Sequence, residues 1–433
     1  MQLTKELLAF FDQTESELEP YFKKTSRIAL INQQKMLAAF QAERIGAHHF
    51  QSTTGYGYHD LGRGALERVF ARVFKAESAL VRQQLVSGTH AIACALLGNL
   101  TPADELVIAS GFPYETLMGV LGIPQGALAA NSQTAGFKVK IQPMAADGSL
   151  DIDGLEQTVS SRTKMVFFQR SCGYAERPSI SIGELRKAFA ALKRINPGLI
   201  IMVDNCYGEF VETEEPLEAG ADLIAGSLIK NPGGCLIPSG GYVAGRKDLV
   251  AKSAERLYVP DIGGAIGPSL LNLQIFFQGF FEAPHRVGEM VKGAVLAAGL
   301  FEKAGFKVAP LASEERTDII QKVFFNSPNQ LIEFCQAVQK NSPVESDVLP
   351  EPAEMPGYTH HVIMGGGTFI SGATSEFSAD APVTPPYVAF LQGGLSYTQI
   401  KLSLAGIFAS KYFPEINQHI LSPVAGKNSE KVN

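Results

Sequence analysis

Ala221-Asp-Leu-Ile-Ala-Gly-Ser-Leu-Ile-Lys-Asn-Pro-Gly-Gly-Cys235 is the stretch that decides the fold. A short apolar run reaches Ser227, Lys230 follows, and Asn-Pro-Gly-Gly then ends the regular structure. The pattern predicts a strand over residues 223–227 with a lysine just beyond its carboxyl end. Because apolar chain adjoins that lysine, we expect its amine to be partly desolvated, which lowers its pKa and makes it a nucleophile toward aldehydes.

Residues 199–203 predict a second apolar strand, which ends in Asp204. An acid and a lysine at neighbouring strand ends suit pyridoxal 5′-phosphate, because the acid keeps the pyridinium nitrogen protonated and the lysine binds the aldehyde. The competing interpretation is that Asp204 begins a turn and that Lys230 is a solvated loop residue. Phosphate-binding and ring-stacking groups elsewhere in the chain must decide between the two.

Length and composition set broad limits. A chain of 433 residues, 45% of them hydrophobic, is long enough for two domains with a substantial core. Its net charge of −6 gives no electrostatic reason to expect nucleic acid or an anionic membrane as a partner. Residues 1–20 contain no apolar signal segment, and no apolar run reaches the roughly 18 residues that span a bilayer. Five cysteines without a CxxC pair favour reduced thiols and a cytoplasmic location, and the histidines lack metal-site spacing.

Strands alternate with helices over the first part of the chain. Strands are predicted over residues 79–86, 105–109, 139–143, 165–169, 199–203, 223–227 and 242–244. Helices are predicted over residues 87–100, 114–121, 151–160 and 182–194. This alternation indicates an α/β fold with a mainly parallel sheet covered on both faces, and ligands bind at the carboxyl ends of such strands.

The rest of the chain predicts supporting and terminal units. We expect a helical arm over residues 1–50 that packs on later domains or on another subunit, a large domain over 51–268, and connecting helices over 269–305. A smaller α+β domain is expected over 306–422, with strands at 317–325, 359–364, 368–373 and 387–391 and helices at 330–339 and 397–409. Residues 423–433 are expected to be a disordered tail.

Several polar groups follow the predicted strands. Ser87, Gly88 and Thr89 open a helix and could hold a phosphate, although Ser87 or Thr89 could equally be an ordinary N-cap. Ser227 could add a further donor, and Tyr114 offers a ring for stacking on a planar cofactor. Arg170 and Arg177 could each bind a carboxylate, or could each form an ordinary ion pair. A glycine-rich loop carries Tyr56, Tyr58 and Arg63, which either make functional contacts or simply pack.

Five of these pieces, in this order, resemble the fold type I pyridoxal-phosphate enzymes. They are Ser87-Gly-Thr-His-Ala91, Gly111-Phe-Pro-Tyr114, Gln169-Arg-Ser171, Val203-Asp-Asn205 and Ser227-Leu-Ile-Lys-Asn-Pro-Gly-Gly234. More closely, the chain resembles the methionine gamma-lyase-like, or aluminium resistance, family related to cystathionine beta-lyases. The likeness runs over about residues 25–415 and includes Arg316-Thr-Asp-Ile-Ile-Gln321 and Leu391-Gln-Gly-Gly394.

The resemblance implies a role for each motif residue. Lys230 would bond to the cofactor and shuttle protons, Asp204 would pair with the pyridinium nitrogen, and Tyr114 would stack on the ring. Ser87, Gly88, Thr89 and Ser227 would hold the phosphate, with Ser171 near the phenolic oxygen. Tyr56, Tyr58 and Arg63 would reach the phosphate of a neighbouring subunit in a homodimer or homotetramer. Arg170, Arg177 and Arg316 are the candidates for the substrate carboxylate.

The function that the resemblance implies is a carbon–sulfur lyase acting on a sulfur-containing amino acid of the cystathionine, cysteine or methionine type. The first alternative is an aminotransferase or another amino-acid enzyme on the same scaffold, since a fold does not fix a reaction. The second is a non-catalytic protein of metal stress.

Overall fold

The computed structural model describes residues 4–123, 136–355, 358–372 and 374–410. The predicted N-terminal arm is one long helix, α1 (Lys5–Ala42), whose first turn is capped by Thr4. Its apolar side chains lie along one face and pack on later parts of the same chain: Leu7 and Phe11 belong to one hydrophobic core, and Met36 belongs to another. The arm therefore packs on the later domains.

The large sheet has seven strands: β1 (Ser78–Arg82), β2 (Glu105–Ile108), β3 (Lys138–Ile141), β4 (Thr163–Gln169), β5 (Ile200–Asp204), β6 (Leu223–Ser227) and β7 (Gly241–Gly245). Their order in space is β1-β7-β6-β5-β4-β2-β3. β7 alone runs in the opposite direction to the other six strands, so the predicted mainly parallel sheet is confirmed. The intervening helices are α2 (Leu61–Phe74), α3 (Gly88–Asn99), α4 (Glu115–Leu121), α6 (Ile152–Thr158), α7 (Ile182–Ile195) and α8 (Lys247–Leu257).

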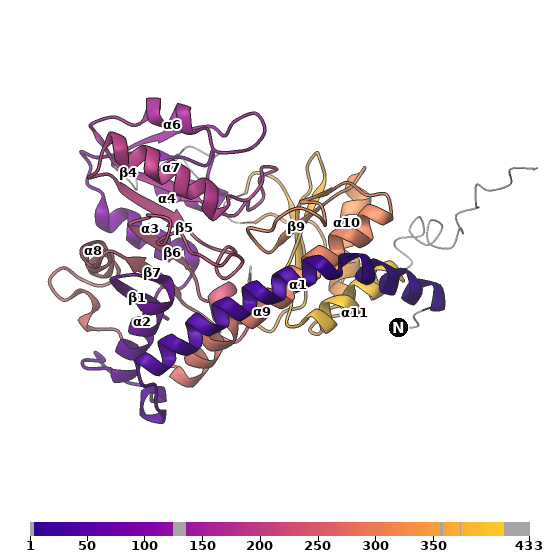
Figure 1. The fold of residues 1–433 in the computed structure, drawn as a ribbon, viewed down its shortest axis with the longest axis horizontal. Coiled ribbons are helices and arrows are strands. Elements are labelled where there is room, and N and C mark those ends of the chain that lie inside the picture. The colour runs from indigo at the N-terminus through magenta and orange to yellow at the C-terminus, as the bar shows by residue number, and fades with distance from the viewer. Residues whose placement is uncertain (1–3, 124–135, 356–357, 373, 411–433) are drawn as a thin grey trace, which may run out of the picture.

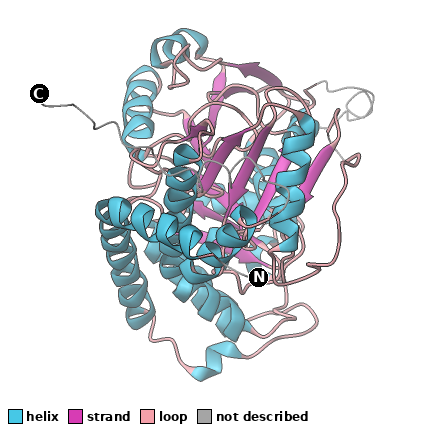
Figure 2. Cartoon of the chain, turned by 90° about the vertical axis from the view of Figure 1, so that its right-hand side faces the viewer, coloured by secondary structure: helices cyan, strands magenta, loops and turns pink. Residues whose placement is uncertain are grey.

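The central strands are apolar on both faces because helices cover both sides of the sheet. Ile201 and Val203 of β5 belong to the core on one side, whereas Ile200 and Met202 belong to the core on the other. Figure 2 shows helices in front of and beside the central strands. The alternation leaves only the strand ends free to present polar groups.

A single helix, α9 (Leu273–Lys303), links the two halves of the molecule. Two helical stretches were expected here, and that expectation was wrong, because the helix continues through Pro284. Proline removes one backbone hydrogen bond from a helix, and burial on both sides of that point compensates for the loss. Phe280 packs in the large-domain core and Phe301 in the small-domain core. Helix α1 lies alongside α9 over much of its length (Figure 1).

The second sheet is smaller and antiparallel, with the order β10-β11-β12-β9-β8. Its strands are β8 (Val308–Ala309), β9 (Ile320–Phe324), β10 (Val362–Gly365), β11 (Ser378–Pro382) and β12 (Val388–Gln392), and its helices are α10 (Pro328–Lys340) and α11 (Tyr397–Phe408). The strand expected at 368–373 was wrong: the described residues there form loop, and β11 begins ten residues later than expected. The predicted tail at 423–433 lies outside the described residues.

No helix among the described residues combines the length and the apolar character needed to cross a membrane. The proposed domain boundaries stay a prediction.

Candidate active site

Lys230 lies three residues beyond the end of β6, where Asn231 fixes the local backbone. Asn231 is fully buried, and its amide group donates to the carbonyl of Glu209 at 3.0 Å. Its side-chain oxygen accepts from the hydroxyl of Ser375 at 2.9 Å. The backbone beside Lys230 is thus anchored to the turn after β5 and to the small domain.

The two glycines of Asn-Pro-Gly-Gly are required by close packing. A Cβ on Gly233 would lie 1.8 Å from the carbonyl oxygen of Leu228. Gly234 has φ of +56°, and a Cβ there would lie 2.3 Å from the carbonyl oxygen of Gly279 in α9. Glycine alone combines this backbone conformation with so close an approach. The motif therefore seats the lysine loop against α9.

The N-terminus of α3 faces the same region. The Ser87 hydroxyl caps the helix by accepting from the backbone N–H of His90 at 3.1 Å. A Cβ on Gly88 would lie 3.2 Å from both Cys206 Sγ and Ser227 Cβ. Gly88 therefore fits between the turn after β5 and the end of β6. This arrangement joins the predicted phosphate-binding residues Gly88 and Ser227.

Tyr114 is the N-cap residue of α4, and its hydroxyl lies 3.1 Å from Thr89 Oγ1. Its backbone N–H donates to Oε1 of Gln169, the last residue of β4, at 3.1 Å. These two contacts hold the predicted stacking ring against both α3 and the sheet edge.

Asp204 ends β5 and is buried, and its Oδ1 accepts from the backbone N–H of Cys206 at 3.1 Å. On the neighbouring strand, Ser171 follows the end of β4 and donates from Oγ to Asp318 Oδ2 at 2.8 Å. Asp204 and Ser171 thus lie at the carboxyl ends of adjacent parallel strands.

One cavity of about 360 Å³ collects these groups. Of the predicted site residues, it is lined by Ser87, Gly88, Thr89, Tyr114, Ser171, Asp204, Ser227 and Lys230. Tyr207, Tyr358, Asp380 and Gln392 also line it, and no role was predicted for these residues from the sequence. The last three come from the small domain, and the motifs Arg316-Thr-Asp-Ile-Ile-Gln321 and Leu391-Gln-Gly-Gly394 were the sequence signals that pointed there.

The pKa of Lys230 differs from the one expected from the sequence. Burial by itself lowers the pKa of a lysine, but the electrostatic effects of Cys206, Tyr207, Asp204 and Tyr114 outweigh it and raise the pKa of Lys230 above its ordinary value. The expectation of a lowered pKa was therefore wrong, because it counted desolvation without these neighbours. The Lys230 ammonium also lies 3.9 Å from the centre of the Tyr207 ring.

The pKa values of the other predicted catalytic groups are also shifted. Burial raises the pKa of Asp204, although Lys230 and Arg177 oppose that effect. Burial and the nearby Asp204 raise the pKa of Tyr114 well above its usual value. Buried titratable groups clustered in one cavity are characteristic of functional sites.

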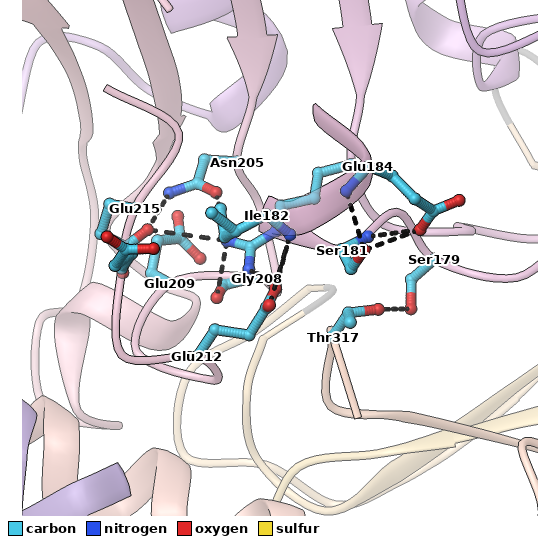
Figure 3. A network of polar contacts seen from close by, with 12 residues as sticks. Ser179, Ser181, Ile182, Glu184, Asn205, Gly208, Glu209, Glu212, Glu215 and Thr317 are labelled. Atoms are coloured by element: carbon cyan, nitrogen blue, oxygen red, sulfur yellow. Dashed lines mark hydrogen bonds and ion pairs between the residues drawn. The ribbon is translucent and has the colours of Figure 1, made fainter. Parts of the chain in front are cut away.

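Arg170, a candidate for the substrate carboxylate, does not line the cavity. It is fully buried, and its guanidinium donates to Asn205 Oδ1 at 2.8 Å, to the carbonyl of Gly208 at 2.9 Å and to Glu212 at 2.7 Å. Asn205 in turn donates to Glu215 at 2.9 Å. Figure 3 shows Asn205, Gly208, Glu212 and Glu215 gathered in this network. Arg170 therefore holds together the turns behind the cavity.

Arg177 and Arg316 also lie outside the cavity lining. Arg177 donates to the backbone carbonyls of Gln169, Ser171 and Pro178, which closes the loop after β4. Arg316 lines a different cavity beside α1, where its guanidinium donates to the carbonyl of Ala294 at 3.5 Å. Lys230 is consequently the only lysine or arginine that lines the main cavity within the described part of the chain.

The loop with Tyr56, Tyr58 and Arg63 contains one buried residue and two exposed ones. Arg63 is buried and donates to the carbonyls of Gly57, Ala265 and Gly267 of its own chain. The rings of Tyr56 and Tyr58 lie 5.6 Å apart, and 70% and 55% of these residues are exposed. Only the tyrosines are therefore free to reach outward.

Comparison with known proteins identifies the family to which the chain belongs. The methionine gamma-lyase family model matches residues 7–412. The chain belongs to the methionine gamma-lyase family. Pyridoxal 5′-phosphate is the cofactor of this family, and the fold is that of the fold type I enzymes, so both expectations are confirmed.

Among similar proteins of the methionine gamma-lyase family are the following three. YnbB, an uncharacterized protein of Bacillus subtilis (strain 168), is 45% identical over 90% of this chain and 92% of its own length. A structure from Listeria monocytogenes, named as a candidate cystathionine beta-lyase involved in aluminium resistance, is 43% identical, covers 96% of this chain and 100% of its own, and has a TM-score of 0.89. A carbon–sulfur lyase from Clostridium novyi NT, likewise linked to aluminium resistance, is 41% identical with 94% and 96% coverage and a TM-score of 0.89.

The cavity suits the family's cofactor. Its volume falls within the range of roughly 300–1,000 Å³ typical of sites for small molecules. The helix N-terminus at Gly88 supplies backbone donors for a phosphate, and Asp204 is a buried acid that forms no ion pair with any described residue. No group of three or more histidine, cysteine or acidic residues among the described residues could hold a metal.

Proposed function

We propose that this chain is a pyridoxal-phosphate-dependent lyase that cleaves a carbon–sulfur bond in a sulfur-containing amino acid by β- or γ-elimination. The observation that carries the proposal is the convergence of Lys230, Asp204 and the N-terminus of α3 on one cavity. Family membership supports the same conclusion.

The cofactor supplies an electron sink for a carbanion at the substrate Cα. Lys230 would bind the cofactor aldehyde and then accept the Cα proton on Nζ. Asp204 would hold a proton on the pyridinium nitrogen, since a buried carboxylate gains most from a cationic partner. Gly88, Thr89 and Ser227 would bind the phosphate.

Tyr114 would cover the ring and keep water from it, and its hydroxyl, aligned by Thr89, could give a proton to the departing sulfur. Ser171 would lie near the phenolic oxygen. Its hydroxyl already donates to Asp318, so it would act there as an acceptor.

Tyr56 and Tyr58 would complete the phosphate site of a neighbouring subunit. The support is their exposure, together with the lack of an arginine in the cavity lining of the described chain. Arg63 would hold the loop in shape, because its guanidinium donors are already directed to backbone carbonyls. The active unit would then be at least a homodimer.

Products of single amino acids test the proposed reaction. The purified protein is incubated with L-cystathionine, L-cysteine or L-methionine, without any keto-acid acceptor, and thiol, ammonia and keto acid are measured together. A lyase releases all three in equal amounts. An aminotransferase releases keto acid only after an acceptor is added, and a non-catalytic protein releases none, so either result would overturn the proposal.

A further inference from the structure

A buried carboxylate stands on the small-domain wall of the cavity. Asp380 lies on β11, and only 1% of it is exposed. Its Oδ2 accepts from the Tyr174 hydroxyl at 2.9 Å and lies 3.5 Å from Nε2 of Gln392. Its other oxygen, Oδ1, has no hydrogen-bond partner within the described residues. The cavity thus contains a second acid besides Asp204, contributed by the small domain.

No cation in the described chain forms an ion pair with Asp380. Lys322 on β9 is buried nearby in the small sheet, but its ammonium donates to the carbonyls of Glu176 and Arg177. Arg177 is directed to backbone carbonyls as well. Lys230 acts on Asp380 only through its longer-range charge. Asp380 therefore has no direct counter-ion among the described residues, and its buried Oδ1 has no hydrogen-bond partner there.

Burying the Asp380 carboxylate costs desolvation free energy, which a neutral residue in a purely structural role would avoid. Burial raises the pKa of Asp380 to about 6, although the Tyr174 hydrogen bond and Lys230 oppose the rise. An asparagine could accept the same hydrogen bond from Tyr174 without a buried charge. A buried acid that lies in a cavity with a shifted pKa is a candidate for a functional role, such as binding a cationic group of a ligand.

We propose that Asp380 binds a cationic group in the part of the substrate beyond sulfur, and so selects amino acids that carry a second ammonium group. The inference rests on the proposed function, because it takes the small-domain wall as the substrate side of the cofactor. An ammonium would donate a charge-assisted hydrogen bond to Oδ1. A methyl-capped side chain would leave that oxygen unpaired and would bind less well.

A matched pair of substrates isolates the ammonium group. For β-elimination the partner of L-cystathionine is S-(3-carboxypropyl)-L-cysteine, and for γ-elimination it is S-(2-carboxyethyl)-L-homocysteine. Each has the same chain as L-cystathionine and lacks only the amino group of the half that does not react. For the unaltered holoenzyme we expect kcat/KM to favour L-cystathionine by about 10-fold or more, mainly through KM. In Asp380→Asn the ratio should fall to near one, because L-cystathionine loses its advantage while the other substrate is little affected. Asp347→Asn, an exposed loop variant, should keep the original ratio.

Equilibrium binding gives a readout that does not depend on turnover. 2,7-Diaminooctanedioate and 2-aminooctanedioate are the all-carbon counterparts of these thioethers, and neither has a carbon–sulfur bond to cleave. Calorimetric titration of the holoenzyme should show the diamino compound binding about 10-fold more tightly. This preference should disappear in Asp380→Asn.

The outcomes separate this inference from the proposed function. If the unaltered protein treats both members of each pair alike, the role of Asp380 is overturned, even if the variant does not fold. A preference that persists in Asp380→Asn overturns it as well. If no thioether releases a keto acid but the diamino compound still binds more tightly through Asp380, the recognition stands and the lyase assignment fails.

Discussion

Arg170 donates a hydrogen bond from Nη1 to Asn205 Oδ1 at 2.8 Å, and this contact ties the end of β4 to the end of β5 immediately beside Asp204. The backbone N–H of Arg170 also donates to the carbonyl of Asp204 at 3.1 Å. Arg170 was a candidate for binding substrate, but its position makes it a residue that holds Asp204 in place.

Arg170→Gln should destabilise the protein rather than weaken substrate binding selectively. Its removal leaves the buried carboxylate of Glu215 and the half-buried carboxylate of Glu212 without their cation, at distances of 3.6 and 2.7 Å in the intact protein. Breaking a buried pair in this way costs about 3–5 kcal/mol in the free energy of unfolding. Denaturant titration measures this loss, and the exposed variant Arg186→Gln should lose about 1 kcal/mol or less. A stable variant with only a raised KM would restore Arg170 as a substrate-binding residue.

Lys230 should carry the cofactor. Borohydride reduction of the holoprotein, followed by peptide mapping, is expected to place the pyridoxyl group on the peptide that contains Lys230. Lys230→Ala should lose both the label and the visible absorption band that reduction removes. A label on another lysine, such as the buried Lys322, would contradict the site assignment.

Asp204→Asn should fold normally and lose most of its activity. An amide carries no charge to keep the pyridinium nitrogen protonated, so the barrier should rise by about 3 kcal/mol and turnover should fall roughly 10²-fold. The measurement is kcat at equal cofactor content, with folding checked by thermal unfolding. Near-normal turnover would return Asp204 to the status of an ordinary strand-end residue.

Asp380→Asn should stabilise the substrate-free protein at alkaline pH. The raised pKa of Asp380, about 6 against an ordinary 3.8, means that the folded state holds this proton more tightly than the unfolded state. Its contribution is complete below about pH 3.8 and is lost as the pH rises through 6, which amounts to about 3 kcal/mol. Denaturant titrations should therefore show that the free energy of unfolding of the variant, relative to that of the parent protein, increases between pH 4 and pH 8. Asp347→Asn serves as the exposed control, and an equal gain at both pH values would contradict the assignment.

Two variants, each inactive alone, test the shared site. One is Lys230→Ala and the other combines Tyr56→Ala with Tyr58→Ala. If the tyrosines serve the neighbouring subunit, a hybrid dimer contains one site with all of its residues, and mixing should restore up to about a quarter of the activity under random exchange of subunits. With exchange of subunits demonstrated independently, no recovery would show that each chain builds its own site.

Sequence alone determined the large sheet and the polar residues at its carboxyl edge that line the cavity. The apolar runs ending at Asp204 and Ser227 were predicted to be strands buried on both faces, and parallel strands bring their carboxyl ends to one edge. The polar residues that follow them therefore meet wherever the sheet forms. Lys230, Asp204 and Gly88 were predicted for this reason, and they line one cavity.

Tertiary structure decided which small-domain residues line the cavity and which groups the guanidinium groups of Arg170 and Arg177 bind. Residues 378–382, Ser-Ala-Asp-Ala-Pro, have none of the β-branched or aromatic residues that signal a strand. They form β11 because β10 and β12 pair with them on both sides, and this pairing brings Asp380 to the cavity. Arg170 and Arg177 had suitable chemistry for a carboxylate, but nearby carbonyls and acids bind their guanidinium groups. Strand pairing and competition for hydrogen-bond donors depend on contacts between residues far apart in the chain, and a local sequence pattern carries no information about them.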